Sequence, residues 1–326
     1  MFAIRSWGFV ATPAAPPPPD PGRGSVLAGL GLLALGWLAL AGGIGVPVRD
    51  APPPLVVTLE AWARPRWGRR PGRNTAERDT TRHDETRRDG GATLPHDWED
   101  PNEVRNWDEH PSRYNPTRPE QVDILVSVVA DLWRPGDWLL DLGCGSGQVE
   151  ELLFTRLPAA GVVGVDSSRE MMRLARARLA GRAFEPLQHD LADLGTLALP
   201  PHPYRCALAV QSLHHLPAPG MAAAYRWLHA RLEPGGVFLL LDRLRVEDAA
   251  TWSLLQPVWR RQDRLLGSRA TEREGADFAA HTATVAERGD RPVLLEEHLT
   301  WLRAAGFAAA CLHLHGNRAL IAGRRQ

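Results

Sequence analysis

The sequence predicts an α/β fold with a mostly parallel, doubly wound, seven-stranded sheet that ends in an antiparallel C-terminal hairpin. Apolar runs of strand length alternate with segments of helical periodicity, and the last two runs flank the turn His315-Gly-Asn317. Repeated strand–helix units build a parallel sheet that helices cover on both faces. The predicted strands are 138–142, 161–165, 184–189, 206–211, 237–241, 308–314 and 319–322.

Helices are expected between these strands. The segment 116–132 has apolar residues at helical spacing, with Thr117 as the N-cap and Pro119 in the first turn. Ser167 and Glu170 are expected to form a capping box for the helix that follows the second strand. The other predicted helices are 149–154, 221–232, 295–305 and a helical insertion over about 247–275.

The most informative segment is the glycine-rich turn that follows the first predicted strand, with Asp141, Gly143, Gly145 and Gly147. Glycines at alternate positions let the backbone turn tightly and approach a ligand that any Cβ would repel. Nineteen residues after Gly147, the second predicted strand ends in Asp166. An acidic residue at that distance accepts hydrogen bonds from ribose hydroxyls in Rossmann-like units. Together these features predict a nucleoside-binding domain.

The amino-acid composition excludes several classes of catalytic site and gives information about the binding partners. The 326 residues carry no net formal charge, and all 38 basic residues are arginine. A balanced charge gives no electrostatic argument for nucleic acid or an anionic membrane as the partner. The absence of lysine excludes a Walker-type phosphate loop and a lysine base or Schiff base. The three cysteines are scattered without metal-binding spacing, so buried thiols in a reducing compartment are expected and no metal site is predicted.

Four regions are expected along the chain. Residues 1–24 form a proline-rich arm, and residues 25–48 carry no charge over a length that can span a bilayer as a helix. Residues 49–95 have the composition of a solvated linker, and a globular domain is expected over 96–326, with a lid insertion at 247–291. The arginines that follow residue 48 would leave the C-terminal part in the cytoplasm. Two alternatives for the arm stay open, an over-extended translation start and a cleaved signal peptide.

The order of the motifs resembles that of class I S-adenosylmethionine-dependent methyltransferases over about residues 96–326. DLGCGSGQ at 141–148 is similar to the first motif of this family, and GVDSS at 164–168 is similar to its acidic second-strand motif. The further matches, in the same order, are HDL at 189–191, LEPGGVFLL at 232–240 and AGF at 305–307.

The resemblance implies methyl transfer from S-adenosylmethionine to a small-molecule acceptor. It places Asp141 near the amino end of the cofactor, Asp166 on both ribose hydroxyls and Met171 over the adenine face. It also implies that Asp190 accepts a hydrogen bond from the adenine amino group. Core packing for Met171 and an ordinary loop acid for Asp190 remain alternatives. The predicted cofactor-binding residues are Asp141, Gly143, Gly145, Gly147, Asp166, Ser167, Met171, Asp190, Leu191 and Gln211.

The segment Gln211-Ser-Leu-His214-His215-Leu216 follows the fourth predicted strand, beside the expected sulfonium. It is not the Asn/Asp-Pro-Pro-Tyr sequence of the methyltransferases that modify the amino groups of DNA bases, which argues against DNA as the partner. His214 or His215 could act as a general base, because imidazole titrates near neutrality. A structural pair is the alternative. The structural role suits His214 better, and His215 is preferred for facing the acceptor.

Four further residues are candidates for acceptor binding. Tyr114 and Arg118 precede the first helix of the domain and could close over the cofactor or the acceptor, with a solvated arginine as the alternative. Trp252 and Trp259 lie in the predicted insertion and would suit an apolar or aromatic acceptor. Plain core packing explains the two tryptophans equally well.

Three other functions remain open. They are a tRNA-modifying methyltransferase, a nicotinamide-dependent oxidoreductase and a catalytically silent cofactor-binding module. Gln148 stands where the dinucleotide-binding pattern expects a glycine, which argues against the oxidoreductase. The neutral charge and the absence of lysine argue against tRNA.

Overall fold

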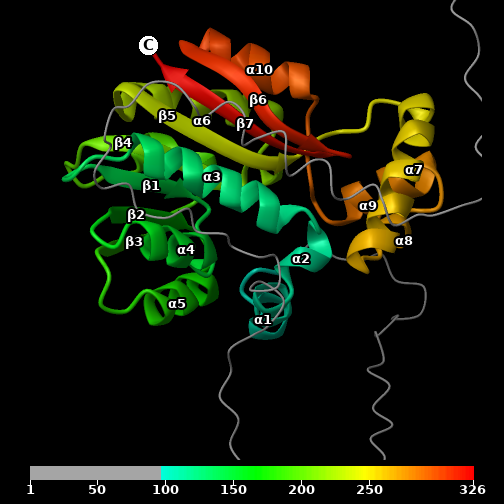
Figure 1. Ribbon diagram of the computed structural model, residues 1–326, viewed down its shortest axis with the longest axis horizontal. Helices are drawn as coiled ribbons and strands as arrows, with labels where there is room; N and C mark the ends of the chain where they lie inside the picture. Colours follow the sequence, from blue (N-terminus) through cyan, green and yellow to red (C-terminus); the bar gives the residue numbers. More distant parts are fainter. Residues whose placement is uncertain (1–96) are drawn as a thin grey trace, which may run out of the picture. The chain divides into compact units, whose positions relative to one another are not determined.

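A computed structural model describes residues 97–326, except for the side chains of Arg113 and Tyr114 (Figure 1). The regions predicted over 1–24, 25–48 and 49–95 lie outside the described residues. Among the described residues, no helix combines the length and the apolar character that crossing a membrane requires.

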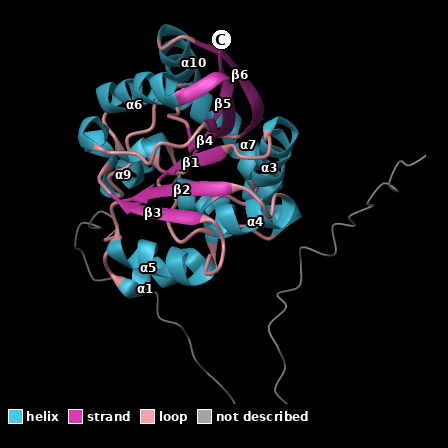
Figure 2. Ribbon diagram, turned by 90° about the vertical axis from the view of Figure 1, so that its left-hand side faces the viewer, coloured by secondary structure: helices cyan, strands magenta, loops and turns pink. Residues whose placement is uncertain are grey.

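A seven-stranded sheet runs through the described part of the chain in the order β3-β2-β1-β4-β5-β7-β6 (Figure 2). The first five strands in this order are parallel, whereas β7 is antiparallel to both β5 and β6. The predicted fold class, a mostly parallel sheet with an antiparallel C-terminal hairpin, is therefore confirmed. The strands are β1 (Trp138–Leu142), β2 (Gly161–Asp166), β3 (Phe184–Gln188), β4 (Tyr204–Val210), β5 (Leu232–Arg243), β6 (Phe307–His315) and β7 (Arg318–Arg325).

Among the helices between the strands, α4 extends beyond its predicted bounds at both ends, α6 begins three residues earlier than predicted, and α3 and α10 are slightly shorter than predicted. Two helices ahead of Arg118 had no counterpart in the prediction, and the predicted insertion consists of three helices beyond the ends of β5 and β7 (Figure 1). The helices are α1 (Pro101–Glu109), α2 (Pro111–Tyr114), α3 (Arg118–Leu132), α4 (Gln148–Arg156), α5 (Arg169–Arg178), α6 (Ala218–Arg231), α7 (Ala249–Leu266), α8 (Ala270–Glu274), α9 (Phe278–Glu287) and α10 (Leu295–Ala304).

Helices cover both faces of the sheet because side chains alternate along its central strands. Leu139 of β1 packs in the core that includes residues of α3 and α4. Leu140 and Leu142 of the same strand pack in the opposite core with residues of α6 and α10. Figure 2 shows α6 and α10 on one side of the sheet and α3 and α4 on the other. Burial on both faces explains why the central strands read as continuous apolar runs.

The strand order reverses between β1 and β4, because the chain moves outward to β2 and β3 on one side and to β5 on the other. Loops that leave two such neighbouring strands diverge and open a crevice at their carboxyl ends. The glycine-rich turn follows β1, and the segment from Gln211 to His215 follows β4. The topology therefore brings these two segments to the same crevice.

The start of α5 differs from the prediction. Its N-cap is Ser168, whose Oγ accepts a hydrogen bond from the backbone nitrogen of Met171 at 3.0 Å. The predicted Ser167–Glu170 capping box is therefore wrong, and Glu170 instead pairs with Arg173 at 2.6 Å. Adjacent serines have nearly equal capping preferences, so the backbone path out of β2 decides which one caps the helix.

The start of α3 also differs in its capping contact. Thr117 occupies the N-cap position, as predicted, but its side chain makes no capping hydrogen bond. Its hydroxyl donates instead to Oδ1 of Asn115 at 2.9 Å. Pro119 lies in the first turn, where the missing N–H costs nothing.

Candidate functional site

A cavity of about 360 Å³ lies in the crevice at the carboxyl ends of β1, β2 and β4, and we call it the cofactor cavity. Its volume falls within the range of about 300–1,000 Å³ that is typical of small-molecule sites. The glycine turn, the ends of β2 and β3, the segment after β4 and the α1 region contribute its walls. Eight of the ten predicted cofactor-binding residues line it: Gly143, Gly145, Asp166, Ser167, Met171, Asp190, Leu191 and Gln211.

The glycine turn brings backbone rather than side chains to the cofactor cavity. Gly143 has φ +83°, and a Cβ added there would lie 2.3 Å from Cβ of Ser212, so only glycine fits between β1 and the segment after β4. Gly145 has φ +55°, a conformation that L side chains rarely adopt, and its backbone lines the cavity. A ligand can therefore approach the main chain closely, as a nucleoside cofactor with an amino-acid moiety requires.

Asp166 holds the glycine turn against the end of β2. Its Oδ2 accepts a hydrogen bond from the backbone nitrogen of Gly145 at 2.9 Å, and its Oδ1 accepts one from that of Ser168 at 2.9 Å. Burial raises the pKa of Asp166, although these hydrogen bonds oppose the rise. Each carboxylate oxygen retains a second lone pair, so the backbone contacts are compatible with the predicted contact to ribose hydroxyls.

Asp141 and Gly147 are the two predicted cofactor-binding residues that do not line the cofactor cavity. Asp141 is buried beneath the turn, and its Oδ1 has no hydrogen-bond partner among the described residues. Glu150 of α4 is also fully buried, and both of its carboxyl oxygens lack such a partner. Burial raises the pKa of Asp141 to about 6 and that of Glu150 well above its usual range. The positive charge of Arg118 opposes the rise of both pKa values, so the two acids already have a cation nearby.

Met171 and Asp190 reach the cofactor cavity from α5 and from the end of β3. Met171 is 5% exposed and lines the cavity, which is compatible with the predicted adenine contact and with packing. Oδ1 of Asp190 accepts a hydrogen bond from the backbone nitrogen of Ala192 at 2.9 Å and caps the short 3-10 helix Leu191–Thr196. The exposed Asp190 side chain therefore has a local structural role as well as a place at the cavity.

The sequence reasoning missed the α1 region, which contributes Trp98 and Trp107 to the cofactor cavity. Their rings meet edge to face, with centroids 6.2 Å apart. A signal was present in Asp100-Pro101, a capping residue followed by proline at the first helical position. Oδ1 of Asp100 accepts a hydrogen bond from the backbone nitrogen of Asn102 at 2.8 Å, as that pattern predicts.

Asp108 fastens α1 to the glycine turn. Its carboxylate accepts hydrogen bonds from the hydroxyl of Ser146 and from Nε2 of Gln148, the latter at 2.7 Å. A guanidinium nitrogen of Arg178 lies 2.9 Å from its Oδ2. Burial opposes ionisation, but these hydrogen bonds outweigh it and lower the pKa of Asp108. The helix that carries Trp107 is thus tied to the turn by an ionised side chain.

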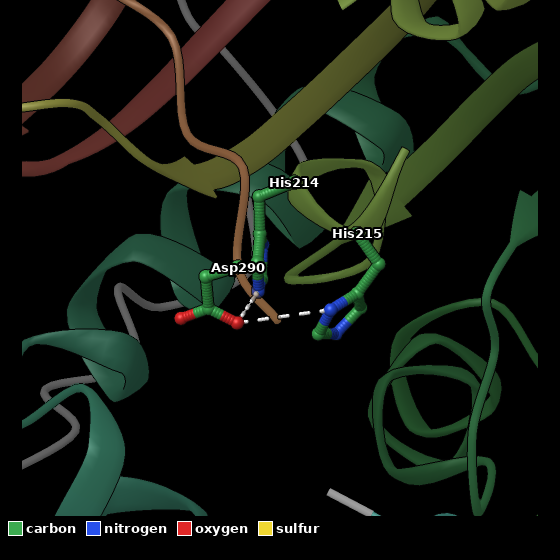
Figure 3. A group of neighbouring side chains, drawn as sticks. All are labelled: His214, His215 and Asp290. Atoms are coloured by element: carbon green, nitrogen blue, oxygen red, sulfur yellow. Dashed lines mark ion pairs between the residues drawn. The ribbon is translucent and has the colours of Figure 1, made fainter. Parts of the chain in front are cut away.

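His214 lies on the short 3-10 helix Leu213–His215, which follows β4 (Figure 3). Its Nδ1 donates a hydrogen bond to Oδ1 of Asp242, and its backbone nitrogen donates to Oδ2 of the same carboxylate at 3.1 Å. Its Nε2 lies 3.5 Å from Oδ1 of Asp290. Burial alone would lower the pKa of His214, but Asp242 and Asp290 outweigh it and raise the pKa. This environment suits a structural imidazolium.

His215 is more open than its neighbour. Its side chain is 35% exposed, and its Nδ1 lies 3.7 Å from Oδ1 of Asp290 (Figure 3). It lines the cofactor cavity and a smaller cavity beside it. The geometry therefore agrees with the expected division between a buried His214 and a His215 that faces bound molecules. A catalytic role for either histidine stays a prediction.

The smaller cavity has a volume of about 60 Å³ and shares Trp98, Trp107, Gln211 and His215 with the cofactor cavity. We call it the arginine cavity, because four arginines from the end of β5, α8, the segment after α9 and the start of β7 line it. They are Arg243, Arg273, Arg288 and Arg318. None of them was a sequence-based candidate, since nothing in their spacing indicates that the fold brings them together.

Arg118 is buried and lines neither the cofactor cavity nor the arginine cavity. Its Nε donates a hydrogen bond to Oε1 of Gln211 at 3.1 Å, and its guanidinium lies 5.9 Å from the ring centroid of Trp107. Burial lowers its pKa to about 10. Gln211 has φ +57°, so Arg118 supports a residue whose backbone is strained. It acts on the site through Gln211 rather than by closing over it.

Trp252 and Trp259 lie in the insertion, as expected, but pack against each other with ring centroids 4.7 Å apart. Both are buried in a small core with Ala270, and neither lines the cofactor cavity or the arginine cavity. This geometry favours the packing alternative. The side chain of Tyr114 lies outside the described residues.

Comparison with known proteins gives a family and a set of relatives. The family described as "Methyltransferase domain" matches residues 139–236. Trans-aconitate 2-methyltransferase of Methylobacterium nodulans is 34% identical over 190 residues, which cover 58% of this chain and 63% of the relative. A carboxy-S-adenosyl-L-methionine synthase of Pseudomonas fluorescens is 28% identical over 63% of this chain and 83% of the relative. The chain thus spans just under two thirds of the first relative, and 48% of two further trans-aconitate methyltransferases.

The fold has counterparts among solved structures. An O-methyltransferase family protein from Burkholderia thailandensis has a TM-score of 0.50 and 18% identity, over 70% of this chain and 61% of that protein. At this identity, the likeness concerns the fold alone. The family match over residues 139–236, the relatives and the sheet order support a class I S-adenosylmethionine-dependent methyltransferase domain. The cofactor of such a domain is S-adenosylmethionine.

Proposed function

We propose that this chain transfers the methyl group of S-adenosylmethionine to a small-molecule acceptor. The observation that carries this proposal is the cofactor cavity, where the glycine turn after β1 and Asp166 after β2 meet at the reversal of strand order. Eight of the ten residues predicted to bind the cofactor line this one cavity. The acceptor is proposed to enter through the arginine cavity, which shares its wall with the cofactor cavity.

The chain's own residues would bind and orient the reactants. Bound S-adenosylmethionine supplies an electrophilic methyl group on a sulfonium, which is already an activated leaving group. Asp166 would hold the nucleoside end, and the buried pair Asp141 and Glu150 would favour the ammonium end. Trp98 and Trp107 would exclude water from the cavity that they line. Alignment of acceptor, methyl group and sulfur can supply most of such a rate enhancement.

Calorimetry with the full chain tests cofactor choice. S-adenosylmethionine and S-adenosylhomocysteine should bind at micromolar order, and nicotinamide dinucleotides should not bind. Asp166→Ala removes an acceptor of charge-assisted hydrogen bonds, each worth about 1.5–3 kcal/mol, so affinity should fall at least about tenfold.

The matched control for this test is Asp123→Ala, since Asp123 is an exposed acid on α3. This variant should bind the cofactor like the parent. Tighter binding of a nicotinamide dinucleotide than of S-adenosylmethionine would contradict the proposal. Unchanged affinity in a folded Asp166→Ala variant would refute the ribose role of Asp166.

A further inference from the structure

Three side chains of metal-binding type converge at the arginine cavity. His214 and His215 follow β4, and Asp290 lies in the segment after α9 (Figure 3). One nitrogen of each imidazole and one carboxylate oxygen of Asp290 lie within 4.8 Å of one another. Neutral imidazole is the commonest metal ligand in proteins. Two histidines and one carboxylate also leave at least one coordination position of a metal open.

The distances between these atoms fit a single cation. Nε2 of His214 lies 3.5 Å from Oδ1 of Asp290, and Nδ1 of His215 lies 3.7 Å from the same oxygen. Metal–ligand bonds of about 2.0–2.2 Å place neighbouring ligand atoms about 3.3–3.6 Å apart in a tetrahedron. Figure 3 shows both imidazoles directed at this one oxygen. A cation among the three atoms therefore requires only small side-chain shifts.

Direct ion pairs without a metal are the alternative explanation. A normal N–H···O hydrogen bond has an N···O distance of about 2.7–3.2 Å, and a bond at 3.6 Å is not formed. The distances of 3.5 and 3.7 Å are therefore long for direct contact and suitable for a bridging cation. In the metal-free chain, Nε2 of His214 keeps a proton, which a bound cation would displace.

Hydrogen bonds behind the proposed ligand atoms would fix their orientation. Nδ1 of His214 donates to Asp242, which leaves Nε2 on the side of Asp290. Oδ2 of Asp290 accepts a hydrogen bond from Nη1 of Arg243 at 2.8 Å, which leaves Oδ1 on the side of the imidazoles. In metal sites, the second nitrogen of a ligating histidine commonly donates to a carboxylate, and ligating carboxylates are themselves hydrogen-bonded. Both supporting contacts are thus present.

The arginines of the cavity oppose a further positive charge. Arg243 and Arg318 are, however, bound to Glu274, at 2.5 Å and 3.2 Å. Asp242 and Asp290, by contrast, both contact the buried imidazole that would ligate the cation. Because Coulomb energy falls with distance, a carboxylate bonded directly to the cation has the greatest weight.

We propose that His214, His215 and Asp290 bind a divalent cation of the zinc type, through Nε2, Nδ1 and Oδ1. Imidazole nitrogen suits Zn²⁺, Co²⁺ and Ni²⁺, whereas Mg²⁺ and Ca²⁺ prefer oxygen ligands. His215 lines both cavities, so the cation lies where the acceptor is proposed to meet the methyl donor, and its open position takes an acceptor oxygen. The cation site rests on the geometry alone, whereas its role towards the acceptor rests on the proposed function.

Cobalt gives the direct test, because the visible absorption of Co²⁺ reports its coordination. The full chain is freed of metal with a chelator, dialysed, and titrated with Co²⁺, Zn²⁺ and Mg²⁺ by calorimetry and absorption. One equivalent of Co²⁺ should bind and show the intense visible bands of a four- or five-coordinate complex. Zn²⁺ should displace it, and Mg²⁺ should not. Azide should shift the bands, because it occupies the open position.

The variant for this test is His215→Ala, because the side chain of His215 is 35% exposed and its loss leaves no large cavity. Affinity for Co²⁺ should fall at least about tenfold, since one of three ligands is lost. His202→Ala is the matched control. His202 is also partly exposed and pairs with a carboxylate, Glu185, at 3.0 Å, but it lines neither cavity. This variant should bind Co²⁺ like the parent.

The cation site and the proposed function fail in different ways. The absence of a one-to-one Co²⁺ complex, equal Co²⁺ affinity in His215→Ala and the parent, or stronger binding of Mg²⁺ than of Zn²⁺ would each overturn the site. A chain that binds neither S-adenosylmethionine nor S-adenosylhomocysteine would instead overturn the methyltransferase function.

The role towards the acceptor is tested with labelled S-adenosylmethionine and an extract of cell metabolites. The metal-free chain should bind S-adenosylhomocysteine as the parent does, yet transfer at least tenfold less label to the extract, and added Zn²⁺ should restore the transfer. Equal transfer with and without metal, including none in either form, would overturn this role.

Discussion

His214 and His215 are adjacent in the sequence, yet their surroundings are opposite in kind. His214 lies between Asp242 and Asp290 and is buried, whereas the side chain of His215 is 35% exposed at two cavities. The sequence could name both as candidates, because imidazole chemistry depends on residue type. It also favoured the structural role for His214, but it could not name the carboxylates that surround this residue, because they come from β5 and from the segment after α9.

We expect His214→Asn to lower the free energy of unfolding by about 3–5 kcal/mol, because it leaves the buried carboxylate of Asp242 unpaired. The pKa of His214 is raised, so its stabilisation is complete below about pH 6.5 and is lost as the pH rises through the folded-state pKa. Against the effect of burial, His214 lowers the pKa of Asp242, so the contribution of that carboxylate is lost only at acidic pH. Urea unfolding at pH 5.5, 7 and 8.5 should show a difference that shrinks as the pH rises.

His215→Asn is the control and should unfold like the parent at each pH. A difference between the parent and His214→Asn that grows with pH would contradict the ion pair with Asp242. The hypothesis that His215 is a general base predicts a different result, which concerns turnover rather than unfolding. Turnover should then fall by about 10²–10⁴-fold in His215→Asn, and the rate of the parent should fall as the pH drops through 6–7.

At the scale of elements, α1 contributes Trp107 to the wall of the cofactor cavity, although no residue of α1 belongs to either core of the sheet. Its contacts run through Asp108 to the glycine turn and through Trp107 to the cofactor cavity. It also packs beside α5. Few apolar contacts hold it, since Val104 is the one buried residue of α1. An element fastened mainly by polar contacts opens more readily than one in a core.

Asp108→Ala should therefore release α1 while the sheet stays folded. The variant loses a carboxylate whose pKa is lowered by hydrogen bonds, chiefly from Arg178, against the effect of burial. Amide hydrogen exchange within 101–109 should become faster, with exchange in α3 as the internal reference. Affinity for S-adenosylhomocysteine should fall about tenfold, because Trp107 is no longer held at the cavity. Glu109→Ala, an exposed acid on the same helix, should change neither quantity, and equal protection of α1 in both variants would refute the fastening role of Asp108.

At the scale of the whole molecule, the described residues contain both cores of the sheet and the residues named above that line the cofactor cavity. We propose that residues 96–326 are a self-sufficient domain. Deletion of residues 1–95 should leave a soluble protein that unfolds cooperatively and binds S-adenosylhomocysteine as tightly as the full chain does. An insoluble product, or one without a cooperative thermal transition by circular dichroism, would contradict this boundary.

The sequence by itself determined the fold class, the order of the strands along the chain and eight of the residues that line the cofactor cavity. These features depend on local signals. Gly143 and Gly145 are required by backbone conformation and close packing, and Asp166 ends a strand at a fixed distance from the turn. Apolar runs of strand length follow directly from burial on both faces of the sheet. Such local requirements determine the residue types in a short stretch of sequence, so they can be recognised there.

Only the tertiary structure decided which residues line the arginine cavity. The arginine cavity collects side chains from β5, α8, the segment after α9 and β7, and no local pattern marks Arg243 or Arg318 as neighbours. From the sequence, Trp252 and Trp259 could equally line a pocket or pack in a core. In the structure they pack against each other in a small core. The physical reason is the same in each case. Long-range electrostatics and side-chain packing depend on which residues the fold brings together, and sequence spacing does not encode that.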